Sequence, residues 1–117
     1  MVDVTEQEFE QLVGEALDLV PAPLLAQLDN VAFFIESEPP PEDPTLLGVY
    51  EGVALTERDA GWAVGSLPDR IVLFRGPLQR FCATAEELRE EVIITVVHEI
   101  AHHFGIDDER LHALGWG

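Results

Sequence analysis

Two histidines stand four residues apart near the end of the sequence, as His98-Glu99-Ile100-Ala101-His102. On a helix this spacing corresponds to roughly 400° of rotation and ~6 Å of rise, so both imidazoles leave the same face at a separation that suits one metal ion. Glu99 stands beside the first histidine, on the flank from which its carboxylate reaches a water molecule held by that ion. The pattern predicts a zinc site with His98 and His102 as ligands and Glu99 as general base.

The pattern continues beyond the second histidine as HExxHxxGxxD, with Gly105 and Asp108 at the last two fixed positions. A glycine can end a helix in the left-handed conformation, which turns the chain back beneath the metal within three residues. A catalytic zinc needs a third protein ligand and keeps one position open, so we expect Asp108 to be that ligand. Asp107 and Glu109 are also acidic, and capping of the last helix by Asp107 or Asp108 is the alternative.

This ligand set predicts hydrolysis of a polarised carbonyl by a zinc-activated water, with Glu99 taking its proton and passing it to the leaving amine. The developing oxyanion needs a donor, for which His112 and Tyr50 are the candidates. His103 lies about 100° around the helix from the second ligand, so we expect it to pack in the core or to orient a ligand. Trp116 is expected to be a core aromatic residue.

The helix that carries the motif is expected over residues 85–104. Thr84 and Glu87 form a capping-box pattern at its start, and Gly105 is placed to end it. Its second half, VIITVVHEIAHHF, is apolar on nearly every side, which predicts a buried helix. Because unpartnered polar groups are costly in a core, burial favours a metal site over histidines that only form hydrogen bonds there.

The remaining elements are short. An amphipathic helix with a capping box at Thr5 and Glu8 is closed by Pro21, and residues 21–30 form a short helical turn. Apolar and β-branched runs predict three strands, and acids open a last short helix. The expected ranges are 31–36, 48–56 and 71–75 for the strands and 107–116 for the last helix. The order predicts one α+β domain over residues 1–117, with a small mixed sheet packed on the buried helix.

The stretches LLGVYEG, LPDRIVLFR and ITVVHEIAHHFGIDDERLHALGW resemble the small zincin-like metallopeptidase family of bacteria, long catalogued as a domain of unknown function. The resemblance implies a minimal zincin fold and an Asp-zincin site, with zinc held by His98, His102 and Asp108 and with Glu99 as general base. It implies no substrate. Metzincins instead have a third histidine and a methionine turn beneath the metal. The only methionine here is Met1, and Trp116 could take the place of that turn.

Charge and composition narrow the partners. The chain has 23 acidic residues against six arginines and no lysine, for a formal net charge of −17. Such a surface repels nucleic acids and anionic membranes, which argues against a metal-dependent ribonuclease with a related His-x3-His arrangement. The N-terminus lacks the pattern of a signal peptide, no apolar stretch approaches the ~20 residues of a membrane span, and the single cysteine, Cys82, is expected to be buried. We therefore expect a cytoplasmic protein that acts on peptides or proteins.

A non-catalytic alternative remains. The same scaffold could serve as a metal-binding or protein-interaction module, and a structural zinc would need a fourth protein ligand, for which His112 is a candidate. Glu99 has no purpose in such a closed site. The open coordination position therefore favours a hydrolase.

Overall fold

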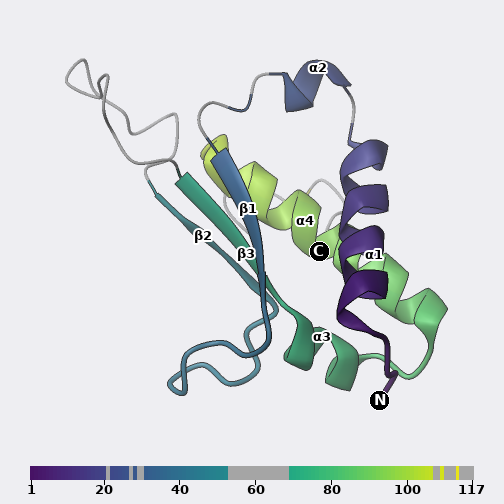
Figure 1. Cartoon of the computed structure of the whole chain (residues 1–117). Coiled ribbons are helices and arrows are strands. Elements are labelled where there is room, and N and C mark those ends of the chain that lie inside the picture. Colours follow the sequence, from purple (N-terminus) through teal and green to yellow (C-terminus); the bar gives the residue numbers. More distant parts are fainter. Residues whose placement is uncertain are drawn as a thin grey trace.

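The computed structural model describes residues 1–20, 22–26, 28, 31–52, 69–106, 109 and 113. Two helices, three strands and two further helices follow one another along the chain (Figure 1). In order they are α1 (Glu6–Leu19), α2 (Ala22–Leu25), β1 (Val31–Glu36), β2 (Gly48–Glu51), β3 (Asp69–Phe74), α3 (Arg75–Phe81) and α4 (Ala85–His103). The α+β class expected from the sequence is confirmed.

The three strands form a mixed sheet in the order β1-β3-β2. The central strand β3 runs parallel to β1, with Val31 opposite Asp69, and antiparallel to β2, with Gly48 opposite Leu73. All four residues from Ile71 to Phe74 are buried. Since successive residues of a strand face opposite sides of the sheet, both faces of β3 are covered.

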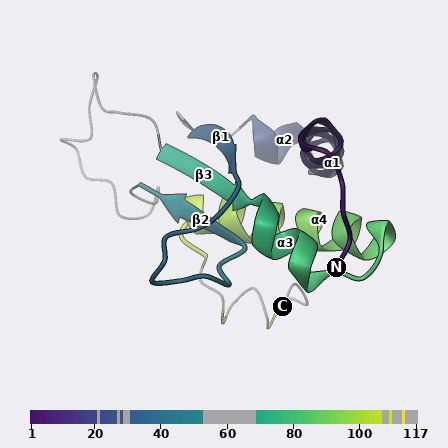
Figure 2. The same cartoon turned by 60° about the horizontal axis from the view of Figure 1, so that its bottom comes forward.

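Helix α4 crosses one face of this sheet and lies beside α1 (Figures 1 and 2). The Thr84 hydroxyl accepts a hydrogen bond from the backbone N–H of Glu87 and caps its first turn. The Glu87 carboxylate accepts from the N–H of Ala83, one residue before the cap, so the reciprocal bond of a capping box is shifted. In α1 the expected capping box between Thr5 and Glu8 is complete.

The core lies where α1, β3 and α4 meet. It is built from apolar side chains spaced for burial on each element: Phe9, Val13 and Ala16 of α1, Ile71 and Leu73 of β3, Leu78 of α3, Cys82, and Leu88, Val92, Val96 and Ile100 of α4. Burial raises the pKa of the Cys82 thiol, and the acidic groups of Glu91 and Glu87 add to the effect. The expectation that this cysteine is a buried apolar residue is confirmed.

Helix α3 was not expected from the sequence, which assigns no element between the third strand and α4. Gly76 and Pro77 are turn formers, but proline is tolerated in the first turn of a helix. Burial of Leu78 packs α3 on the core, and Arg80 binds both carboxylate oxygens of Glu38 at 2.7 and 3.0 Å. The guanidinium holds the pKa of the Glu38 carboxyl below its ordinary value.

The observed bounds of two strands differ from the predicted ones. The third strand spans Asp69–Phe74, so it begins two residues earlier than predicted. Arg75, predicted to be its last residue, is the first residue of α3. The second strand ends at Glu51, and Gly52 forms a bend. Residues 53–56 of its predicted range lie outside the described residues, as does most of the predicted last helix. In the described ranges no helix is long and apolar enough to cross a membrane.

The end of α4 is fixed by backbone geometry. Gly105 has φ +79°, and the N–H groups of Gly105 and Ile106 donate to the carbonyls of His102 and Ala101. This pair of bonds is a Schellman motif, which satisfies the last carbonyls and turns the chain away from the helix axis. The helix end expected at Gly105 is confirmed.

Two glycine substitutions test this assignment. Gly105→Ala is expected to lower the free energy of unfolding by about 1 kcal/mol, because an L-residue is strained in the left-handed region. Gly14→Ala, at an exposed position of α1 where an added Cβ meets nothing within 4 Å, should raise it by about 0.5–1 kcal/mol. Urea denaturation measures both, and stabilisation by Gly105→Ala would contradict the left-handed end.

Candidate metal centre

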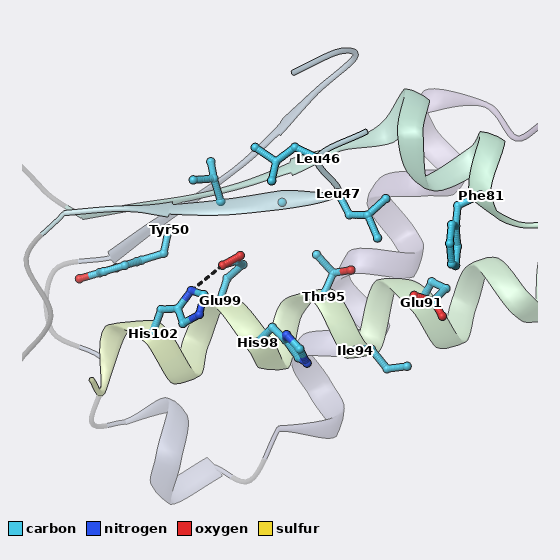
Figure 3. A pocket seen from close by; sticks show the side chains of 12 residues that line it. Leu46, Leu47, Tyr50, Phe81, Glu91, Ile94, Thr95, His98, Glu99 and His102 are labelled. Carbon is cyan, nitrogen blue, oxygen red and sulfur yellow. Dashed lines mark hydrogen bonds and ion pairs between the residues drawn. The ribbon is translucent and has the colours of Figure 1, made fainter. Parts of the chain in front are cut away.

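His98 and His102 open onto a cleft of about 700 Å³ between β2 and α4 (Figure 3). They stand one turn apart on α4, as the sequence predicted, and both are only partly buried. The His102 side chain retains 31% of its exposure. A helix that is otherwise a core element therefore presents two imidazoles to one solvent-accessible space.

Glu99 lines the same cleft but is itself buried, at 6% relative exposure. Its Oε1 lies 2.9 Å from Nδ1 of His102 (Figure 3). With the Nδ1 proton donated to this carboxylate, Nε2 of His102 is the nitrogen that would ligate a metal. A carboxylate so placed orients a ligand and stands within reach of groups bound in the cleft.

A buried polar cluster joins this end of α4 to the sheet. His103 and Asp69 are both fully buried, and Nδ1 of His103 lies 3.3 Å from Oδ2 of Asp69. The Tyr50 hydroxyl donates to the same Asp69 oxygen and lies 3.3 Å from Nδ1 of His103. The three residues come from β2, β3 and α4, so the cluster fixes the position of α4 beneath the sheet.

This cluster defines the surroundings of two predicted site residues. His103 is a packing and hydrogen-bonding residue, with its ring edge-on to the rings of Tyr50 and Phe104. Tyr50 lines the cleft, but its hydroxyl points away from Glu99 and His102 (Figure 3) and bonds Asp69. Its role as an oxyanion donor stays a prediction, one that requires this hydrogen bond to be exchanged.

Three predicted site residues, Asp108, His112 and Trp116, lie outside the described residues, and so does Asp107. Within the part of the chain that the structure describes, no group of three metal-ligating side chains gathers. His98, Glu99 and His102 line the same cleft without forming such a group on their own, and the third ligand stays a prediction.

Comparison with known proteins decides the family. The sequence profile of the zincin-like metallopeptidases matches residues 28–116. The chain belongs to the zincin-like metallopeptidase family.

This zincin-like chain matches no curated protein. Among solved structures it is similar to a conserved hypothetical protein from Thermo thermophilus, with a TM-score of 0.59 and 26% sequence identity. The similarity covers 95% of this chain and 97% of that chain. Nearly the whole zincin-like chain therefore has a counterpart of similar fold.

The donors that this zincin-like chain presents fit a zinc ion. Two imidazoles one helical turn apart are typical zinc ligands, and a carboxylate or a third nitrogen completes such a site. Glu99 lines the cleft beside these imidazoles, with its carboxylate in contact with His102. The partial exposure of His102 keeps its imidazole accessible from the cleft.

The sequence did not reveal Asp69, Thr95 and Gly48 as parts of this region. Thr95 is buried in the cleft wall. A Cβ atom added to Gly48 would come within 2.8 Å of the Cγ2 atom of Thr95. Glycine therefore permits the close approach of β2 to α4 that forms one wall of the cleft. An acid just before an apolar strand was the only signal for Asp69.

Removing Asp69 tests the buried cluster. Asp69→Ala is expected to lower the free energy of unfolding by about 1–3 kcal/mol, because fully buried His103 and partly buried Tyr50 both lose an acceptor. Arg70→Ala is the matched control. Its exposed side chain pairs with Glu36 and Glu51 at 3.8 and 3.6 Å, and loss of such surface pairs costs about 1 kcal/mol or less. Chemical denaturation compares them, and equal losses would contradict a stabilising cluster.

Proposed function

We propose that this chain is a zinc-dependent metallopeptidase that hydrolyses peptide bonds in the cleft between β2 and α4. One observation carries the proposal: two histidines one turn apart on α4 open onto the same cleft as a buried glutamate. His98 and His102 would hold the ion as neutral imidazoles. The bound zinc would supply Lewis acidity and lower the pKa of a water molecule.

Glu99 would act as the general base and then as the general acid. Its carboxylate takes a proton from the attacking water and returns it to the leaving amine. The contact with His102 holds the carboxylate on the cleft side of α4, where a scissile bond would lie. Burial beneath β2 limits its rotamers, so the proton acceptor is positioned before the substrate arrives.

Asp108 is the third ligand in this proposal. The support comes from the end of α4, where Gly105 and the Schellman motif turn the chain out of the helix three residues before the aspartate. A carboxylate completes the ligand set of a catalytic zinc and leaves one position for the reacting molecule. Asp107 as an N-cap of the following segment is consistent with the same geometry.

Peptides are the substrate class that the cleft suits best. Among the described strands β2 lies at an edge of the sheet, and it forms one wall of the cleft. An extended peptide can hydrogen-bond to such an edge. The formal net charge of −17 disfavours nucleic acids as substrates.

Zinc affinity tests the ligands. His98→Ala and His102→Ala are each expected to weaken zinc binding about 100-fold or more, because each removes a ligand. Asp108→Ala should also weaken it markedly. Asp107→Ala is the neighbouring control: it should keep the affinity and cost at most about 1 kcal/mol of stability if it caps a helix.

The measurement is a competition titration against a chromophoric chelator. Parent-like affinity in both histidine variants would place the site elsewhere. A loss in Asp107→Ala alone would move the ligand by one residue. Equal affinity in both aspartate variants would reopen His112 as the candidate third ligand.

Glu99→Gln separates a hydrolase from a binding module. The variant is expected to keep its zinc, because Glu99 is not a ligand, and to lose about 10²-fold or more of the peptidase rate with the general base. Glu90→Gln, an exposed position on the same helix, should keep the parent rate. The measurement is the rate at which the parent and each variant hydrolyse a mixed peptide library. An unchanged rate in Glu99→Gln would exclude this site, and zinc binding without hydrolysis by the parent would favour a binding module.

A further inference from the structure

The cleft has two chemically distinct ends. Tyr50 and the histidines stand at one end, and the other end is walled by Leu47, Ile94 and Phe81, which come from three separate segments; Leu46 lies nearer to Glu99 (Figure 3). Leu46 and Leu47 precede β2, Phe81 ends α3, and Ile94 lies on α4. The apolar end is continuous with the histidine end.

Phe81 is the most exposed of these side chains. It retains 66% of its exposure, whereas Leu78 on the same short helix is fully buried. A second hollow of about 220 Å³, lined by Pro44, Leu47 and Arg80 among others, lies against the same phenyl ring. The ring therefore stands between two depressions, where it can be covered by an incoming apolar group.

The charged side chains among the described lining of the cleft are both acidic. Glu91 and Glu99 both line it, and its described lining includes no arginine. Glu91 lies beneath the Phe81 ring on the next helix (Figure 3). A ligand that fills the apolar end therefore meets a carboxylate beside the aromatic wall, which favours a basic neighbour.

The spacing along α4 sets the reach of a bound peptide. From Ile94 to the turn between His98 and His102 the helix rises by roughly 9 Å, at about 1.5 Å per residue. An extended peptide advances about 3.3 Å per residue, so this span corresponds to about three of its residues. A peptide cut at the histidines thus reaches the apolar end with a side chain about three residues from the cut bond.

We propose that Phe81, Leu47 and Ile94 form a subsite for a large apolar side chain of an extended peptide, and that Glu91 selects a basic residue next to it. This inference rests on the proposed function, because the same cleft holds the scissile bond. It names the substrate class: peptides with an adjoining apolar and basic pair about three residues from the cleaved bond.

Binding to the zinc-loaded Glu99→Gln protein tests the subsite without hydrolysis. The probe is a fluorescein-labelled decapeptide of alanine, glycine and serine with a central Phe-Arg pair, which can slide until the phenyl ring reaches the subsite. Fluorescence anisotropy should show it binding about tenfold or more tightly than the Ser-Arg counterpart, because the ring leaves water. Replacement of arginine by glutamate in the peptide should weaken binding further.

Two serine variants localise the effect. Adding Phe81→Ser should abolish the preference for Phe-Arg over Ser-Arg. Phe34→Ser is the matched control, because Phe34 is also exposed, at 44%, but lies on β1 away from the cleft. It should keep the preference. Thermal melts confirm that each protein is folded, as expected for exposed positions.

Equal binding of the two peptides, or an equal loss in both serine variants, would overturn the subsite. These outcomes are distinct from failure of the proposed function. Hydrolysis by the parent with no peptide preference would retain the peptidase and reject the subsite. A preference that depends on Phe81, without hydrolysis of any library peptide by the parent, would retain the subsite and reject the peptidase.

Discussion

The structure depends on burying polar side chains in a helix that is also part of the core. Helix α4 places Leu88, Val92, Val96 and Ile100 against α1 and the sheet, and the same helix carries Glu99 and His103. Buried polar groups are tolerated only with partners. No buried side-chain nitrogen or oxygen in the described part of the chain lacks one. Satisfying these groups fixes where β2 and β3 must lie.

This constraint links the fold to the cleft. Tyr50 and Asp69 approach His103 from two strands, which holds β2 over the histidine face of α4. Gly48 lets the strand come close to Thr95, and the remaining space becomes the cleft. The ligand helix and the cleft wall are therefore set by the same contacts, so a change in the buried cluster would also alter the site.

Much of this arrangement could be predicted because it is local. The capping of α1 and α4, the end at Gly105 and the common face of His98 and His102 all follow from spacing within a few residues. The contact between Tyr50 and His103 spans 53 residues. No pattern in a single sequence specifies such a pair. Likewise α3 forms because Leu78 finds a place in the core, which overrides the turn tendency of Gly76 and Pro77.

Membership of the zincin-like metallopeptidase family and the geometry of α4 support the same chemistry from independent directions. The family comparison covers nearly all of the chain after β1 begins, whereas the geometry rests on three side chains of one helix. Neither the family comparison nor the geometry of α4 alone accounts for the apolar end of the cleft. It comes from the packing of α3 beside α4, and in our proposal it is the part of the cleft that would select among peptides.

The central claim is that one metal ion lies between His98 and His102. Anomalous diffraction at the zinc edge from crystals of the zinc-loaded protein tests it directly. We predict a single strong peak within about 2.0–2.1 Å of a ring nitrogen of each histidine, the usual zinc–imidazole distance. A peak elsewhere in the chain, or none at these two residues under full zinc loading, would contradict the account.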